Sequence, residues 1–470
     1  MIATPASAQQ GVEQINRRLD QLERENAQLR KDIMDVTSKP MPSYRSKNEG
    51  SGESGMRSSF AIGTDSSFSY EMLDPTQAGK SKPLLLIDAA RSGALQKGTI
   101  IGGALTAVTD FQWTNVPDKM GYMMRHPGEH PGKTASEAML HSAQVGIATN
   151  YMRGISSYVE LLYEPTTSFG TGTPTDLSRN LVQVRRGYIT FGDLKSSPFY
   201  AQIGKIDSPF GYGSTVNPFS LSMTSHGFAG LSYGALVGYS RNGLNIALEA
   251  AQGGAEFRGL NSPVHGTKVP SDLNNFVGDI NYRIPLGAAR SFMLGASYEH
   301  GSSYCQNFPI THFGACATNN PAYAVYAEFV IDRFKVKGEF AQTVKAWPGT
   351  RNPNAPLNRF DASPVTAFDV GVSYETMPVL WGRPVTLSAE YSKLNVGASG
   401  SPWEFQDQLV AGIAYKPKDS VKLFVEGIRV EGYAPLQFLS GGVPGLPPTF
   451  LFSDRNGQTN VVLAGINAAF

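Results

Sequence analysis

The chain of 470 residues has little charge. Only 17% of its residues are Asp, Glu, Lys or Arg, whereas about 25% is usual for soluble domains. The formal net charge is +1, so the chain lacks the basic surface with which nucleic-acid-binding proteins hold phosphates. Cysteine is also scarce. Two cysteines are too few for a zinc cage or a disulfide scaffold, although they are enough for one bridge.

Long apolar runs are missing as well. No stretch of 18 residues is both uncharged and apolar, which excludes membrane-spanning helices. A membrane-spanning β-barrel stays open, because only alternate residues of each strand need be apolar. Glycine and aromatic residues are abundant instead, with 50 Gly, 20 Tyr and 25 Phe, and this sets the chain apart from ordinary cytosolic proteins.

Residues 1–8 carry a processing signal. They end in Ala6-Ser7-Ala8, the small-residue pattern of a secretory cleavage site. We therefore expect residues 1–8 to be the residual end of a signal peptide. An ordinary disordered N-terminus is the alternative.

Residues 9–37 repeat apolar side chains with the heptad spacing of a coiled coil. The predicted core positions are Val12, Ile15, Leu19, Leu22, Asn26, Leu29, Ile33 and Val36. A single helix has nothing against which to bury so thin an apolar seam. We therefore expect the segment to associate with copies of itself and to make the protein a homo-oligomer. The alternative is an amphipathic helix that packs on its own domain. Residues 38–97 then read as a flexible Gly/Ser-rich linker and a short apolar segment near Leu84–Ala90.

From residue 98 to residue 470 the sequence alternates apolar and polar residues in repeated short segments. In one of them, Phe334, Val336 and Phe340 alternate with Lys335, Lys337 and Glu339. Sixteen such segments start near residues 98, 139, 155, 181, 198, 232, 243, 274, 290, 322, 334, 365, 383, 403, 420 and 459. Long and short connections alternate between these segments, as in membrane barrels with short periplasmic turns and long outer loops.

The sequence therefore predicts an all-β protein, a 16-stranded antiparallel transmembrane β-barrel preceded by an N-terminal α-helical coiled-coil segment. The last segment agrees with this interpretation, because its apolar face ends in Ile466, Ala468 and the terminal Phe470. The expected location is the bacterial outer membrane, with the coiled coil in the periplasm. The barrel partner is then outer-membrane lipid.

A barrel of sixteen strands leaves an aqueous channel, whereas about eight strands would be filled by side chains. Its inward face is predicted to carry nine acids and five bases, too few bases for a pore that strongly selects phosphate or other anions. The predicted pore-lining acids are Asp110, Glu160, Glu249, Asp279, Glu328, Glu339, Asp369, Glu390 and Glu426. The predicted bases are Arg185, Arg283, Lys335, Lys337 and Lys422. The adjacent pair Arg185-Arg186 could face the lumen together only at a β-bulge.

The long connection at residues 207–231 follows the fifth strand, where general porins fold a loop into the channel, and it is the candidate constriction loop. Its candidate residues are Phe210, Tyr212, Phe219, His226 and Phe228. An outer loop that caps a neighbour is the alternative. In another long loop, Cys305 and Cys316 are predicted to form a disulfide, because signal-processed proteins meet an oxidising compartment.

Two motifs point to chemistry that the context does not support. Gly230-Leu-Ser232-Tyr-Gly234 matches the hydrolase motif G-x-S-x-G, but that motif needs a strand-to-helix elbow, and here it opens a barrel strand. His126 and His130 have the i, i+4 spacing of two metal ligands on one face of a helix. Pro127 and Gly128 lie between them, and they prevent such a helix. No enzyme activity, metal site or cofactor is predicted.

The segment VQVRRGYITFGDLKSSPFYAQIGKIDSPFG at 182–211 resembles a paired-strand signature of coiled-coil outer-membrane porins. With the coiled coil, the linker and the barrel ending in Phe, the layout resembles the LbtU-type siderophore porin family. The resemblance implies passive, TonB-independent passage of an iron-siderophore or similar small solute. The predicted function is thus a porin-like outer-membrane channel. The alternative is a non-conducting structural anchor that links the membrane to the cell wall through the coiled coil.

Overall fold

The computed structural model describes residues 61–95, 98–122, 132–164, 182–252, 273, 275–305, 319–436, 439–440, 451 and 453–470. The residual signal-peptide end and the predicted coiled coil lie outside these residues. Within the described ranges, none of the helices has the length and apolar character that crossing a lipid bilayer requires.

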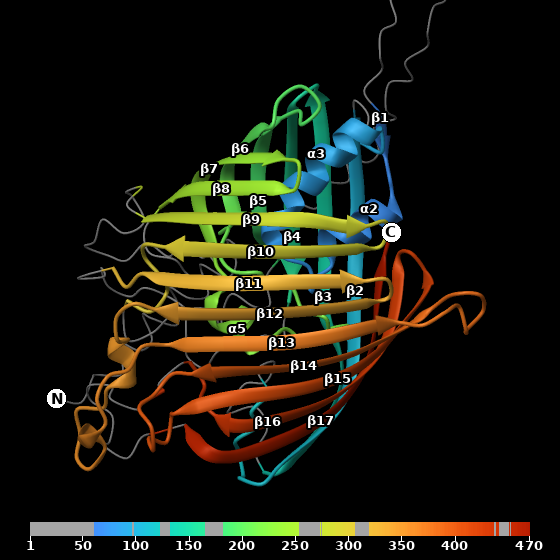
Figure 1. The fold of residues 1–470 in the computed structure, drawn as a ribbon. Helices are drawn as coiled ribbons and strands as arrows, with labels where there is room; N and C mark the ends of the chain where they lie inside the picture. The colour runs from blue at the N-terminus through green and yellow to red at the C-terminus, as the bar shows by residue number, and fades with distance from the viewer. Residues whose placement is uncertain are drawn as a thin grey trace, which may run out of the picture. The chain divides into compact units, whose positions relative to one another are not determined.

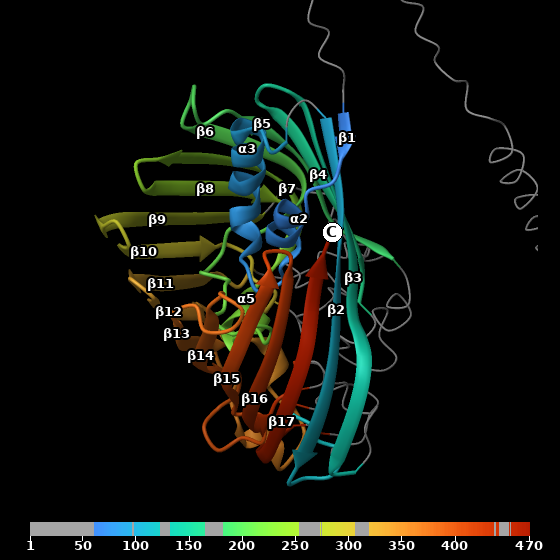
Figure 2. The same cartoon turned by 90° about the vertical axis from the view of Figure 1, so that its right-hand side faces the viewer.

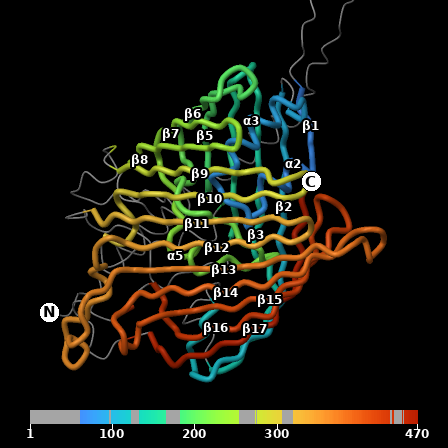
Figure 3. The backbone as a smooth tube through the Cα atoms, viewed as in Figure 1, coloured from blue at the N-terminus to red at the C-terminus, as the bar shows by residue number. Residues whose placement is uncertain are grey.

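Sixteen antiparallel strands of the described chain form a closed barrel (Figure 1). They are β2 (Gly98–Thr114), β3 (Thr134–Met152), β4 (Ile155–Tyr163), β5 (Gln183–Gly192), β6 (Phe199–Asp207), β7 (Leu231–Arg241), β8 (Leu244–Ala251), β9 (Asn275–Gly287), β10 (Arg290–Glu299), β11 (Ala322–Ile331), β12 (Phe334–Thr343), β13 (Thr366–Glu375), β14 (Val385–Asn395), β15 (Phe405–Lys418), β16 (Val421–Tyr433) and β17 (Asp454–Ala469). Each strand pairs with its neighbours in sequence, as the continuous change of colour around the ring shows (Figure 3). The last strand closes the ring on the first, with the pairing running from Thr459↔Thr114 to Ala469↔Ala104. The predicted barrel is confirmed.

The strand starts match the prediction within five residues, and the largest differences have a local cause. On β3, the pairing with β2 shifts between Thr106 and Ala107, so the alternation before Leu140 has the opposite phase to the alternation after it. On β17, the register with β16 shifts near Tyr433, and the extra residues at the start of the strand are mostly polar. At such irregularities the alternation of inward and outward side chains is interrupted, so it no longer predicts which face a residue lies on.

The two faces of the barrel wall differ as the alternation predicts. On β2, Phe111 is 49% and Leu105 is 50% exposed on the outer face, whereas Asp110 is 7% exposed and Gln112 is buried on the inner face. This is the reverse of a soluble protein, in which apolar side chains avoid water. An apolar outer surface with a polar interior suits a barrel surrounded by lipid.

Residues 61–95 form a small helical structure in the segment that was expected to be linker. It consists of β1 (Ala61–Gly63), α2 (Ser66–Leu73), the 3₁₀ turn η1 (Gly79–Ser81) and α3 (Lys82–Ser92). The α2 helix starts where the Asp65 side chain accepts hydrogen bonds from the backbone N–H groups of Ser67 and Phe68, an N-cap. The α3 helix includes the apolar segment Leu84–Ala90 and ends at Gly93, whose φ of 89° suits glycine.

We call residues 64–95 the insert, because they lie within the ring of strands (Figure 2). Leu73, Leu86 and Ile87 of the insert share a buried cluster with Tyr158 of β4 and Tyr188 of β5 on the inner wall. The apolar stripe of α3 therefore buries itself against the barrel interior. The insert ends close to where it begins, because β1 pairs in parallel with the start of β2, Ala61 opposite Gly98.

Candidate functional site: the barrel lumen and its inward loop

The connection between β6 and β7 folds into the barrel. It contains the helix α5 (Met223–Phe228), which lies within the ring of strands (Figure 1). The helix begins where the Ser222 hydroxyl accepts a hydrogen bond from the Ser225 N–H at 3.1 Å, and it packs against β12–β15. Residues 208–230, which we call the inner loop, are therefore attached far around the ring from the strands that carry them.

Three glutamates of the wall hold the inner loop by its backbone. They project from alternate strands, Glu339 from β12, Glu390 from β14 and Glu426 from β16. Glu339 accepts a hydrogen bond from the Tyr212 N–H at 2.7 Å, and Glu390 accepts one from the Val216 N–H at 3.3 Å. All three side chains are buried, and hydrogen bonds that a carboxylate accepts from backbone N–H groups are of the stronger, charge-assisted kind.

Glu426 makes the densest set of these contacts. Its Oε1 accepts hydrogen bonds from the N–H groups of Phe219 at 2.7 Å and Ser220 at 3.0 Å. Its Oε2 accepts the Ser220 hydroxyl at 2.5 Å. The carboxylate is buried on the inner face of β16, so the inner loop covers it from the lumen side.

Lys337 offsets part of the negative charge of Glu390 and of the neighbouring Asp369. The Nζ of Lys337 on β12 lies 2.6 Å from Asp369 Oδ1 and 2.8 Å from Glu390 Oε2. It also donates to the backbone carbonyl of Ser214 in the inner loop, at 3.1 Å. Lys337 thus joins two strands and the loop in one buried ion cluster.

The aromatic residues of the inner loop are packed rather than free. The ring of Phe219 stacks on Phe424 of β16 with centroids 5.1 Å apart, and Phe210 stacks on Phe228 at 5.9 Å. The Tyr212 hydroxyl donates to a carboxylate oxygen of Glu328. His226 is half-buried. The predicted constriction residues therefore lie in the lumen, but their rings serve mainly to attach the loop.

The other predicted pore-lining charges also face the interior, and several pair with one another. Glu328 on β11 pairs with Arg283 at 2.7 Å and with Lys335 at 2.9 Å. The remaining acids accept hydrogen bonds from neighbours on the wall: Gln112 Nε2 reaches Asp110 at 3.4 Å, and the Ser232 hydroxyl donates to Glu249. The inner face therefore carries both acidic and basic side chains, and several of them neutralise one another in ion pairs.

A bulge brings Arg185 and Arg186 to the same carboxylate. The register of β4 and β5 shifts between Glu160 and Leu161. Arg186 then lies 2.5 Å from Glu160 and 2.7 Å from Asp207, while Arg185 lies 3.5 Å from Glu160. Arg186, the more buried of the two, was absent from the predicted pore-lining set. The adjacent arginines were the available signal, since strict alternation cannot place both inward.

The insert contributes charges that sequence reasoning did not place in the lumen. Asp74 pairs with Lys422 of β16 at 3.4 Å, and Lys80 pairs with Asp279 of β9 at 3.0 Å. Burial alone would raise the pKa of Asp74, but the charge of Lys422 and the hydrogen bonds from Thr76 outweigh it and lower the pKa. Burial lowers the pKa of Lys80, and the nearby Asp279 carboxylate opposes that shift.

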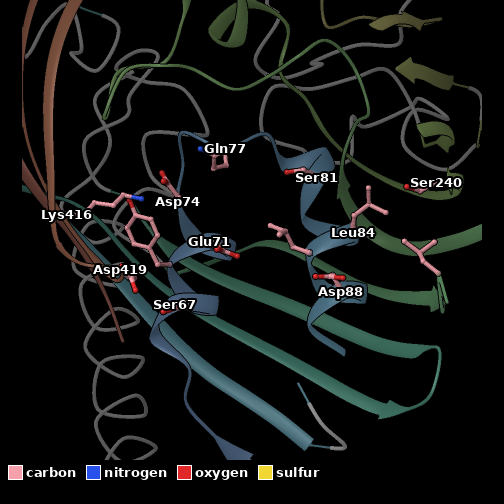
Figure 4. Close-up of a pocket in the computed structure, with 13 residues that line it drawn as sticks. Ser67, Glu71, Asp74, Gln77, Ser81, Leu84, Asp88, Ser240, Lys416 and Asp419 are labelled. Carbon is pink, nitrogen blue, oxygen red and sulfur yellow. The ribbon is translucent and has the colours of Figure 1, made fainter. Parts of the chain in front are cut away.

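A cavity of about 760 Å³ lies between α2, α3 and the turns at this end of the barrel (Figure 4). Leu84, Leu85 and Leu194 are among its lining residues, and Lys416 lies across the cavity from Leu84 (Figure 4). Asp419 of the β15–β16 turn, one of the short turns, also borders the cavity. The insert therefore supplies most of the residues that line this cavity.

The predicted disulfide joins two cysteines of which the structure describes one. Cys305 is described, but Cys316 is not, so the disulfide stays a prediction. His126 and His130 also lie outside the described residues. Among the side chains that the structure describes, no group of three His, Cys, Asp or Glu residues is arranged to hold a metal ion.

Neither a protein-family model nor a curated protein sequence matches this chain. Among solved structures it is similar to OprB of Pseudomonas putida, with a TM-score of 0.51 and 9% identity over 82% of this chain and 97% of that one. It is also similar to the outer membrane channel DcaP of Acinetobacter baumannii, with a TM-score of 0.46 and 14% identity over 79% and 98% of the two chains. A third similar structure is OmpT, an outer membrane protein of Vibrio cholerae, with a TM-score of 0.44 and 12% identity over 79% and 98%. The likeness to OprB supports the barrel fold.

Proposed function

We propose that this protein is an outer-membrane porin-like channel for a small solute. The observation that carries the proposal is the barrel itself, a closed ring of sixteen strands with an apolar outer face, a charged inner face and a long loop folded into the lumen. Sixteen strands are enough to enclose an aqueous path. The side chains of the inner face pair with one another and with the loop, which is an arrangement for passage and positioning rather than for bond chemistry.

The proposal extends to TonB-independent passage, with a ferric siderophore as the candidate solute. Energised, plugged transporters use about 22 strands, and here the insert is two short helices rather than a globular plug. The mixed charges of the wall, such as Arg283 beside Glu328, favour a solute that carries groups of both signs over a simple anion. The LbtU-type resemblance is the source of the siderophore assignment.

We further propose that the long loops face the outside, and that residues 9–37 associate copies of the chain in the periplasm. Both termini of the barrel lie at the short-turn end, since β2 begins and β17 ends there. A segment that precedes β2 then belongs to the periplasmic side. Trypsin added to intact cells should cut the long loops and spare residues 9–37, and the opposite pattern would invert this orientation.

The test of the channel is single-channel recording of the purified protein in a planar bilayer. Stable steps of conductance that a ferric siderophore blocks would support both the channel and its solute. The iron-free siderophore is the matched control, because it separates recognition of the complex from simple obstruction. Steps that no siderophore affects would leave the channel and remove the solute assignment.

A second function, the non-conducting anchor, is favoured by one observation. The insert is joined to the wall by buried ion pairs at Lys422 and Asp279. A lumen obstructed permanently in this way would carry no current. Silence of the folded protein across salts and voltages, with the insert both present and removed, would place the anchor first.

A further inference from the structure

Residues 74–82, which we call the strap, connect α2 to α3 and cross the lumen. At one end Asp74 pairs with Lys422 on β16, and near the other end Lys80 pairs with Asp279 on β9. These two strands are seven places apart in a ring of sixteen, so they lie on nearly opposite walls. The Asp74–Lys422 pair is buried, with side chains 5% and 6% exposed. In the other pair Asp279 is 1% exposed and Lys80 is 15% exposed.

The strap also meets the inner loop along its length. The Thr215 N–H donates to the carbonyl of Thr76 at 3.2 Å, and the Ala78 N–H donates to the Ser214 hydroxyl at 2.9 Å. Farther along, the Lys80 ammonium donates to the carbonyl of Gly211. The strap and the loop therefore form one hydrogen-bonded layer across the barrel.

The strap fits tightly against the wall at Gly79. A Cβ atom on this residue would lie 2.0 Å from Asp207 Cγ on β6, so a larger residue here would have to displace the Asp207 carboxylate. Lys80 lies beyond it, donating to the Tyr326 hydroxyl at 2.9 Å and lying 4.3 Å from the centre of that ring. The contacts on this wall are polar and specific in shape.

We infer that the insert is a displaceable gate, and that release of the Lys80–Asp279 and Asp74–Lys422 pairs opens the lumen. This inference rests on the proposed channel function and adds the regulation of its path. Because β1 and the start of β2 are paired side by side, the insert leaves and rejoins the wall at one place on the rim. It can therefore move as a flap without any change in the pairing of the sixteen barrel strands.

The wall beneath the insert shows why the contact is suited to opening. The hydroxyls of Tyr158 and Tyr188 and the Oε1 atom of Gln144 are buried, and they form no hydrogen bond to any residue that the structure describes. A buried polar atom without a partner costs free energy, which water returns when the atom is exposed. Tyr158 and Tyr188 lie in the same cluster as Leu86 and Ile87 of α3. Moving α3 away thus hydrates polar groups, which offsets part of the lost apolar contact.

The test records single channels from the full chain and from the variants Lys80→Met and Asp74→Asn. Each substitution removes one end of the strap's attachment. We expect the open fraction to rise at least tenfold in either variant, since loss of a buried ion-pair partner changes an equilibrium by more than one decade. The control is Arg290→Met, which breaks an exposed 3.2 Å pair with Asp332 at a turn and should record like the unmodified chain.

A second variant replaces residues 64–97 with a short Gly/Ser linker, which the adjacent positions of Ala61 and Gly98 permit. Heat-dependent gel mobility shows that each barrel is folded before recording. A larger or more persistent current in the folded strap variants supports the gate. Equal currents in the unmodified chain and in all folded variants overturn the gate and leave the channel. Silence of all of them, the linker variant included, overturns the channel and the gate with it.

Discussion

The Glu426 carboxylate on β16 accepts a hydrogen bond from the backbone N–H of Phe219, at 2.7 Å, although more than 200 residues separate them. The contact joins the inner loop to a strand far around the ring from β6 and β7. It also changes the meaning of the acid. A glutamate that the alternation places in a pore would be expected to attract cations. The Glu426 carboxylate instead accepts hydrogen bonds that hold the inner loop in place.

Replacing Glu426 with Ala should free this part of the inner loop. The substitution leaves the N–H groups of Phe219 and Ser220 without their acceptor, at a cost of about 1–3 kcal/mol for each buried donor. We expect larger and noisier conductance steps, because the loop no longer keeps one position. Hydrogen exchange at residues 217–222 should become faster. The matched control is Glu431→Ala on the same strand, whose side chain is 40% exposed and pairs with Arg429, and it should change neither readout.

Replacing Lys337 with Met should destabilise the barrel strongly. It would leave the buried Asp369 and Glu390 without the ammonium that lies 2.6 Å and 2.8 Å from them. Removing one partner of a buried pair typically costs about 3–5 kcal/mol. The denaturant midpoint of unfolding in detergent measures this loss.

The comparison for Lys337 is Arg290→Met, which removes an exposed pair with Asp332 at 3.2 Å. Exposed pairs contribute about 0.2–1 kcal/mol, so its midpoint should stay near that of the unmodified chain. Equal losses in the two variants would contradict a special role for the buried cluster.

The barrel could be predicted from the sequence because the alternation is a direct consequence of its two environments. Each strand such as β12 has Phe334 and Val336 outside and Lys335 and Lys337 inside, so period two survives in the sequence. It fails only where the pairing slips, as at Arg185 on β5. A slip depends on the partner strand, which a single segment does not reveal.

The candidate site was harder to predict, because its meaning depends on what covers the inner wall. Alternation put Glu339, Glu390 and Glu426 on the inner face, but it could not show that the loop after β6 donates hydrogen bonds to their carboxylates. The strap was hidden further, because residues near Lys80 have the polar, Gly-containing composition of a linker. Long-range contacts such as that of Lys80 with Asp279 fix the conformation of the strap. The local sequence does not reveal such contacts.

Deleting residues 9–37 tests the proposed association of chains. We expect a folded barrel whose native mass is lower than that of the full chain, because the heptad core from Val12 to Val36 would hold the copies together. The substitution Asn26→Leu is a useful companion, since a polar residue at a core position limits the choice of register and partner number. An assembly of unchanged size after the deletion would remove the oligomerising role of this segment.

The docking of α3 should strengthen as the pH rises above neutrality, because of Lys82. Burial lowers the pKa of this lysine to about 7, and the neighbouring Arg186 adds to the shift while Glu160 opposes it. In the displaced insert the side chain regains its ordinary pKa of about 10.4, so between these values the displaced state holds one more proton than the docked state. Raising the pH through this window therefore favours docking.

Below pH 7 both states are protonated, so the full cost of burying the charge applies and docking is weakest. The slope within the window is at most about 1.4 kcal/mol per pH unit for one proton. Hydrogen-exchange protection of residues 82–92, corrected for the intrinsic effect of pH, should rise from pH 7 to pH 9. In the variant Lys82→Met the same residues should keep a nearly constant protection. A rise of equal size in that variant would assign the pH dependence to other groups, of which Lys80 is the nearest candidate, since burial lowers its pKa as well.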